Sequence, residues 1–244
     1  MNLRLPMLDA DPASPFPPAD TALREPDGLL AMGGDLSPVR LLNAYVHGAF
    51  PWFSAGQPIL WWSPDPRTVF RSDGVRLSSR MRRQFRRSDW RIVADQDFDA
   101  VIAACASAPR PGQDGTWITP GMRAAYGELH RLGHAHSIEV RDGGDRLVGG
   151  LYGVAIGRMF FGESMFSAES GGSKAALAGL AHRLREWGWP LLDAQVGNPH
   201  LATLGAEAWT RPRFLESIAG LCAQPGNPGA WAGTFDALPT SALG

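Results

Sequence analysis

The 244-residue sequence has two cysteines, one lysine and no long uninterrupted hydrophobic run. Two cysteines are too few for a disulfide framework, and Cys105 and Cys222 lie in apolar segments, so we expect buried thiols in a reducing compartment. Neither has the spacing of a metal site, so no metal is expected. No segment approaches the ~18 apolar residues of a membrane helix. Residues 1–20 lack the apolar core of a secretory signal. We therefore expect a cytoplasmic protein without membrane association.

Positive charge comes almost entirely from arginine, because Lys174 is the only lysine. The formal net charge is −1, so the chain as a whole lacks the basic excess typical of nucleic-acid-binding domains. Hydrophobic residues make up 44% and charged residues 19%, as in soluble globular proteins. Any contact with a nucleic acid would therefore have to come from a local cluster of arginines.

Residues 1–35 are rich in proline, aspartate and glycine and are predicted to be irregular. Ser37 followed by Pro38 is typical of a helix start, and Gly48 should end that helix. Four prolines exclude a regular helix from the tryptophan-rich segment that follows.

We place a domain boundary at residues 62–66, which gives a small N-terminal domain (1–62) and a larger C-terminal domain (63–244). In the larger part, three strand patterns in succession, then helix, strand and helix, indicate an α+β fold with a mixed sheet rather than a doubly wound one. Helical patterns cover 78–87, 98–105, 119–133, 173–187 and 211–222, strand patterns cover 136–141, 147–156, 159–166 and 191–196, and 225–244 is predicted to be a coil-like tail.

Five arginines lie within eight residues of one predicted helix: Arg80, Arg82, Arg83, Arg86 and Arg87. Such a surface can neutralise phosphates of a nucleic acid. A solvated helix face, or one paired with acidic groups of the same chain, explains the cluster equally well.

Glu163 lies among bulky apolar residues near the end of a predicted strand. Strand alternation places Phe161, Glu163 and Met165 on one face, which favours a pocket with hydrophobic walls and one charge. The alternative is that Glu163 points into solvent.

Asp193, Gln195 and Asn198 gather where another predicted strand ends, a common position for ligands in sheets. The simpler interpretation is capping, with Asn198 at the start of the next helix. Residues 171–174 begin a helix with glycines and a lysine, which suits either an anion or a flexible cap. They do not match a phosphate-binding loop of the Walker type. His134 and His136 lack further ligands for a metal.

Several segments resemble the leucyl/phenylalanyl-tRNA–protein transferases, in the order of that family, and the resemblance spans about residues 16–216. These segments are 28–37, 48–53, 59–67, 115–119, 132–139, 162–167 and 193–195. The resemblance implies a larger domain of the acetyltransferase-like (GNAT) type. It also implies transfer of Leu or Phe, and more weakly Met, from aminoacyl-tRNA to proteins with N-terminal Arg or Lys. This activity belongs to the N-end rule degradation pathway and needs no cofactor.

The same resemblance assigns roles to individual residues. Catalysis would fall to Asp193 and Gln195, with Glu163 beside them. Our own mechanistic hypothesis is that Asp193 orients Gln195 and helps to take up the proton of the amine. The site of the 3′-terminal adenosine would be lined by Trp52, Trp117 and Tyr126. The pocket for the transferred side chain would be formed by Leu151, Phe160, Met165 and Leu192. The arginine cluster would hold the phosphates of the acceptor stem.

Two other functions stay open. An acyl-CoA-dependent N-acyltransferase would suit the predicted fold but needs a pyrophosphate loop, which residues 170–174 supply poorly. A non-catalytic RNA-binding module would explain arginines and aromatics but not the clusters around Glu163 and Asp193.

Overall fold

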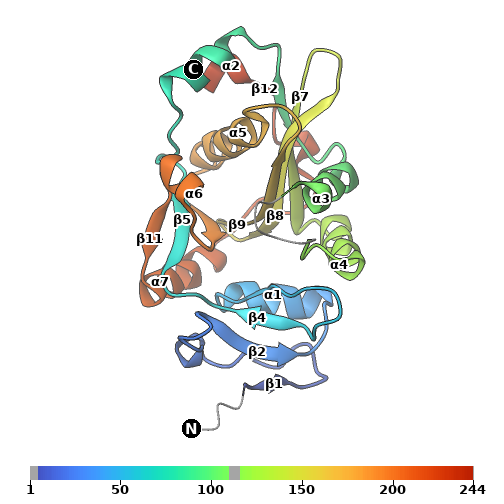
Figure 1. Cartoon of the computed structure of the whole chain (residues 1–244), viewed down its shortest axis with the longest axis vertical. Coiled ribbons are helices and arrows are strands. Elements are labelled where there is room, and N and C mark those ends of the chain that lie inside the picture. The colour runs from blue at the N-terminus through green and yellow to red at the C-terminus, as the bar shows by residue number, and fades with distance from the viewer. Residues whose placement is uncertain (1–4, 110–115, 244) are drawn as a thin grey trace.

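The computed structural model describes residues 5–109 and 116–243. Two sheets organise the molecule: a four-stranded sheet from the N-terminal residues and an eight-stranded sheet from the rest of the chain (Figure 1). Both contain parallel and antiparallel pairs. The expected α+β organisation with a mixed sheet is therefore confirmed, whereas its assignment to the GNAT type stays a prediction.

The four-stranded sheet corrects the prediction that residues 1–35 are irregular. Leu30 and Ala31 are buried on a strand whose antiparallel partner lies thirty residues later, so local composition does not reveal it. Ser37 caps the following helix as predicted, and the backbone of Gly48 after that helix has a φ of +75°. The elements are β1 (Met7–Leu8), η1 (Ala19–Thr21), β2 (Leu29–Gly33), α1 (Pro38–Val46), β3 (Phe50–Pro51) and β4 (Leu60–Trp62), with strand order β1-β2-β4-β3.

The eight-stranded sheet contains a single parallel pair, formed by β9 and β10. Each strand predicted for the larger part of the chain is present. In spatial order the strands are β11 (Glu207–Trp209), β5 (Arg67–Arg71), β10 (Leu191–Gln195), β9 (Met159–Ser167), β8 (Leu147–Ile156), β7 (Ala135–Arg141), β6 (Arg91–Ala94) and β12 (Leu238–Pro239).

Helices cover both faces of β7 to β9. On one face lie α3 (Phe98–Ser107) and α4 (Pro120–Arg131), and on the other lies α5 (Gly172–Glu186) (Figure 1). Ten of the 15 residues of α5 are buried, more than one amphipathic stripe would bury, because other segments pack around it. The remaining helices are α2 (Ser79–Arg87), α6 (Pro199–Thr203) and α7 (Arg211–Cys222).

The C-terminal segment is not the coil that its proline and glycine content predicts. Residues 225–243 contain η2 (Trp231–Gly233), β12 and η3 (Thr240–Leu243). Trp231 is fully buried, and β12 pairs with β6. Thr240 donates its backbone N–H to the carbonyl oxygen of Trp90 at 3.0 Å, and its hydroxyl lies 2.8 Å from that of Ser88 at the end of α2. The segment is therefore part of the folded structure.

The predicted domain boundary coincides with the gap between β4 and β5. One hydrophobic cluster nevertheless joins the two sheets, because Tyr45 and Trp61 share it with Tyr126 and Phe161. The division into 1–62 and 63–244 stays a prediction. Cys105 is buried as expected, but Cys222 is only half-buried, because it ends α7. Within the described residues, no helix has the length and apolar character needed to cross a bilayer.

Candidate active site

A cavity of about 440 Å³ opens where strands β9 and β10 separate. The two strands pair in parallel from Leu191 to Asp193, and no pairing follows beyond that point. The freed ends of both strands line the cavity, together with residues of β3, β8 and α5. Its lining includes Phe50, Trp52, Phe70, Trp117, Leu151, Phe160, Glu163, Met165, Leu177, Leu192, Asp193, Gln195 and Asn198.

A β-bulge on each strand shapes this opening. The register between β8 and β9 shifts at Glu163, and that between β10 and β5 shifts between Asp193 and Gln195. Gln195 has a φ of +59°, a conformation that costs a non-glycine residue free energy and often marks functional sites. The first bulge corrects the predicted alternation. Phe161 and Glu163 share a face, but Met165 packs in the opposite hydrophobic cluster, because the extra residue inverts the order.

The carboxyl group of Glu163 is the centre of a buried hydrogen-bond network. The hydroxyls of Tyr45 and Tyr126 donate to its two oxygens at 2.7 and 2.8 Å, and Nε2 of Gln195 donates at 2.7 Å. Burial raises the pKa of Glu163 from 4.5 to about 7, although these three hydrogen bonds oppose the rise. A group with this pKa can both accept and release a proton near neutral pH.

Asp193 is fully buried and forms an ion pair with Arg67. Nε and Nη2 of Arg67 donate to its two carboxylate oxygens at 2.8 and 2.6 Å, and the backbone N–H of Gln195 donates at 2.9 Å. Arg67 is itself fixed, because it donates to the carbonyl oxygen of Gly48 at 2.9 Å and lies over the ring of Phe214 at 4.5 Å. Asp193 therefore holds the strained backbone of Gln195 in place.

The four residues expected to form the amino-acid pocket all line the cavity: Leu151, Phe160, Met165 and Leu192. Three of them are buried, and Met165 is half-buried. These four residues come from three neighbouring strands of the sheet, β8, β9 and β10.

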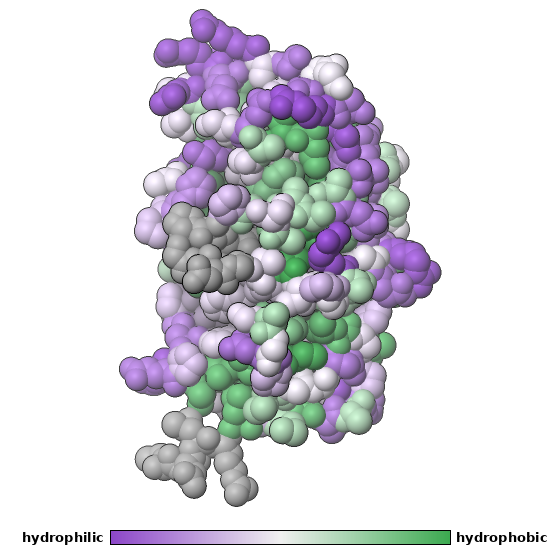
Figure 2. Space-filling model, turned by 45° about the vertical axis from the view of Figure 1, so that its right-hand side comes forward, coloured by the Kyte–Doolittle hydropathy of each residue, from purple (hydrophilic) through white to green (hydrophobic). Residues whose placement is uncertain are grey.

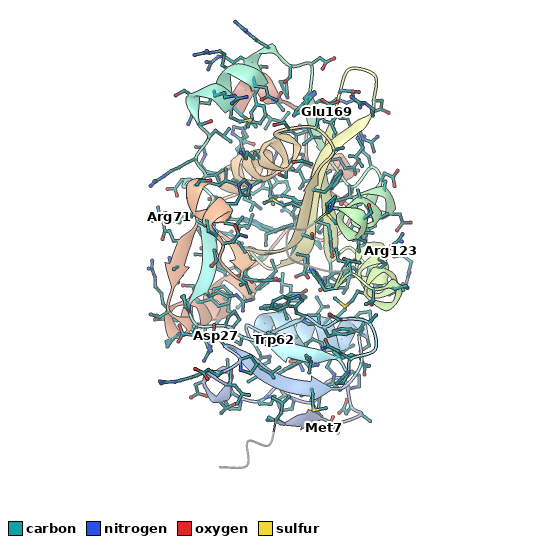
Figure 3. All side chains as sticks on the ribbon, viewed as in Figure 1. Met7, Asp27, Trp62, Arg71, Arg123 and Glu169 are labelled. Carbon is teal, nitrogen blue, oxygen red and sulfur yellow. The ribbon has the colours of Figure 1, made fainter. Side chains whose placement is uncertain are left out.

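Two of the three aromatic residues expected around the adenosine also line the cavity. Trp52 is 36% exposed and its ring packs on that of Trp62. Nε1 of Trp62 donates to the backbone carbonyl oxygen of Trp52 at 2.7 Å. Figure 3 labels Trp62 at the boundary between the small sheet and the rest of the molecule. Trp117 is half-buried at the wall. Tyr126 is fully buried behind Glu163 and is not among the residues that line the cavity, so its expected place in the adenosine site stays a prediction.

All five arginines of the predicted cluster are exposed on α2, whereas Phe85 on its inner face is fully buried. No ion pair joins them to any acidic group in the described part of the chain. The end of the molecule that carries α2 is hydrophilic in Figure 2. The cluster lies outside the cavity lining and presents free positive charge to solvent.

The glycines that begin α5 serve packing. A Cβ on Gly172 would lie 2.3 Å from the carbonyl oxygen of Val148, so the start of the helix touches β8. Ser173 donates its backbone N–H to the hydroxyl of Ser167 at 2.9 Å. These contacts fix the start of the helix against β8 and β9.

A second depression, of about 650 Å³, lies at the opposite end of β10. It is larger, but its acidic residue, Asp73, is exposed and bound to Arg71. It contains no buried carboxylate, so the cavity beside Glu163 is the better candidate. Among residues 5–109 and 116–243, no group of three His, Cys, Asp or Glu side chains could hold a metal ion.

Two family models match the chain. The model described as leucyl/phenylalanyl-tRNA protein transferase matches residues 69–219, and the model of its N-terminal domain matches residues 34–65. The leucyl/phenylalanyl-tRNA–protein transferase of Xanthomonas axonopodis pv. citri (strain 306) is 66% identical over 238 residues, which cover 98% of this chain and 95% of that protein. The chain belongs to the leucyl/phenylalanyl-tRNA–protein transferase family.

Further relatives with the same name agree with this assignment. That of Xanthomonas campestris pv. campestris (strain 8004) is 64% identical and covers 100% of this chain and 98% of its own length. That of Xylella fastidiosa (strain 9a5c) is 61% identical, with 94% of each chain covered. Two solved structures have low TM-scores. L-PGS from Bacillus licheniformis gives 0.37 at 10% identity, covering 69% of this chain and 53% of its own. A functionally unknown Staphylococcus epidermidis protein gives 0.41 at 11% identity, covering 75% and 68%.

Two residues of this candidate site are not evident from the sequence. The sequence analysis does not single out Tyr45, and it includes Arg67 only as the end of the segment 59–67. Tyr45 binds Glu163 and Arg67 binds Asp193, and each pair is more than a hundred residues apart in the sequence. A sequence signal did exist for Arg67, because an arginine within an apolar strand needs a partner once it is buried.

Proposed function

We propose that this transferase moves Leu or Phe, and Met less efficiently, from aminoacyl-tRNA to the α-amine of proteins with N-terminal Arg or Lys. The acceptors would thereby enter the N-end rule degradation pathway. The observation that carries this proposal is the joining of an apolar pocket to the buried Glu163–Gln195 pair within one cavity. The transferred hydrophobic side chain requires the apolar pocket, and the attacking amine of the acceptor requires the polar pair.

The aminoacyl end of the tRNA would occupy the cavity in three parts. The transferred side chain would lie against Phe160 and Leu192. The terminal adenine would stack on Trp52 or Trp117, an interaction worth about 1–3 kcal/mol. The arginines of α2 would contact phosphates of the acceptor stem, which positions the tRNA without reading its sequence.

The reaction forms an amide bond and breaks an ester bond. The acceptor nitrogen attacks the ester carbonyl carbon, the C–O bond to the terminal ribose breaks, and the ribose oxygen takes up a proton. Glu163 would accept the proton from the attacking amine and return it to the leaving oxygen. Its pKa of about 7 is close to the reference value of about 7.7–8.0 for an α-amine, which favours transfer in both directions.

Gln195 would orient the amine. Its Nε2 is used in the bond to Glu163, so its Oε1 is left to accept from the amine. Asp193 would act as a positioning residue. Arg67 donates to both carboxylate oxygens of Asp193, which leaves this carboxylate poorly placed to accept a proton. We therefore assign the proton transfer to Glu163 instead of Asp193. Holding the two reactants together would supply up to about 7–11 kcal/mol of the barrier reduction.

The two rival functions are less well supported. An acyl-CoA transferase would need an anion site at the start of α5, where Gly172 packs closely on Val148. A non-catalytic RNA-binding module would have no use for a buried carboxyl with a pKa of about 7.

A transfer assay with the full chain tests the proposal. Radiolabelled Leu-tRNA would be incubated with a peptide that begins with Arg, and label in the peptide would be measured. We expect labelling of the free peptide, none of the N-acetylated peptide, and a loss of about 100-fold or more in Glu163→Gln. Labelling that Glu163→Gln leaves unchanged would remove the role of Glu163, and labelling from leucyl-CoA instead of Leu-tRNA would favour the acyl-CoA alternative.

A further inference from the structure

Trp231 is fully buried in the C-terminal segment, and it lies outside the residues that the family models match. Its ring stacks on His136 with 3.9 Å between centroids and 6° between planes. Trp187 and Trp189 contact it edge-on, and its backbone N–H donates to Asp95 at 2.6 Å. The indole therefore has a single fixed position.

The fixed indole also touches the amino-acid pocket. The ring centroid of Phe160 lies 5.8 Å from that of Trp231, at an angle of 38°. Phe160 also packs over Gly153, where an added Cβ would lie 2.5 Å from its Cε1. Phe160 is fully buried and lines the cavity. The ring of Phe160 is thus held on one side by Gly153 and on another by Trp231 of the C-terminal segment.

We propose that Trp231 is a positioning residue that sets the size of the amino-acid pocket, and with it the preference between Leu and Phe, by holding the ring of Phe160 in place. This inference rests on the proposed function, because it takes Phe160 as a wall of the pocket. Without the indole, the ring of Phe160 can move away from the cavity. The enlarged pocket then favours the bulkier side chain.

Competition between Leu-tRNA and Phe-tRNA in one reaction provides the test. The ratio of the two kcat/KM values does not depend on the fraction of folded enzyme, so partial unfolding cannot imitate the effect. We expect Trp231→Leu to shift this ratio toward Phe by at least about threefold. Adding or removing one methylene of the substrate changes such a ratio by about tenfold or more, and a displaced ring should have a smaller effect. Trp231→Phe should give a smaller shift in the same direction, because it retains part of the ring.

Phe235→Leu is the matched control. Phe235 is buried in the same segment and contacts Trp187 and Arg183, but it has no ring contact with Phe160 among the described residues. It should lower the melting temperature and leave the ratio unchanged. If Phe235→Leu shifts the ratio as much as Trp231→Leu, the effect comes from general loosening of the tail and the proposal is overturned.

Phe160→Leu separates this proposal from the proposed function. Alone it should shift the ratio, and adding Trp231→Leu should then change little, because the ring that Trp231 positions is gone. If Phe160→Leu shifts the ratio and neither Trp231 variant does, only the role of Trp231 is overturned. If Phe160→Leu has no effect, the assignment of the amino-acid pocket itself is wrong.

Discussion

Replacing Glu163 with glutamine tests whether burial raises the pKa of this carboxyl group into the neutral range in the native protein. Burial raises its pKa from 4.5 to about 7. A carboxyl with a raised pKa in the folded state contributes stability that is fully present below about pH 4.5. That contribution is lost as the pH rises through about 7, because the folded protein then has to hold a buried charge.

The size of the effect follows from the two pKa values. Each pH unit between 4.5 and about 7 corresponds to about 1.4 kcal/mol, which gives about 3 kcal/mol in total. Glutamine does not titrate, so Glu163→Gln should gain stability relative to the native protein as the pH rises. About 2 to 3 kcal/mol of this gain should appear between pH 5 and pH 8.5.

Urea unfolding at both pH values measures the effect, as free energies extrapolated to water. Glu128→Gln is a suitable control, because its hydrogen bond from Arg131 on the surface lowers the pKa of Glu128, despite slight opposition from burial. Because a carboxyl with a lowered pKa titrates below about pH 4.5, the stability of that variant relative to the native protein should not change between pH 5 and pH 8.5. The reasoning is refuted if the difference between native protein and Glu163→Gln is the same at both pH values.

Three further predictions concern other parts of the site. Arg67→Met should destabilise the protein by about 3–5 kcal/mol in urea unfolding, because it leaves a buried carboxylate without its cation; a loss below about 1 kcal/mol would contradict this. Changing Arg82, Arg83 and Arg86 to Glu should weaken tRNA binding and flatten its dependence on salt, measured by filter binding. An unchanged slope would mean that these arginines contact no phosphates. Trp52→Ala should cost about 1–3 kcal/mol in calorimetric binding of a non-hydrolysable aminoacyl-adenosine analogue, and unchanged affinity would exclude stacking on this ring.

Local signals in the sequence were sufficient for α1 and for most elements of the larger part. Ser37, Ser78, Thr119 and Asn198 each accept a hydrogen bond from a backbone N–H at the start of the predicted helix. Such caps depend on residues three apart, so they can be recognised without knowledge of the fold. The turn between β7 and β8 has a local signal too, because Gly143 and Gly144 lie between the two paired strands.

Features that join distant parts of the chain could not be predicted in this way. The bond between Tyr45 and Glu163 spans 118 residues, and that between Arg67 and Asp193 spans 126. The bulges at Glu163 and after Asp193 each add one residue to a strand, which residue alternation alone does not reveal. The polar cluster could be located from the family resemblance, but the division of roles between its two carboxylates required the structure.

The contact between Thr240 and Ser88 has a consequence for how the protein is made. The hydroxyl that meets the end of the arginine helix lies 152 residues later in the chain. A ribosome must therefore add 152 residues after Ser88 before this helix end can acquire its last partner. While these residues are being added, the nascent chain carries five exposed arginines on a segment that has not yet docked at both ends.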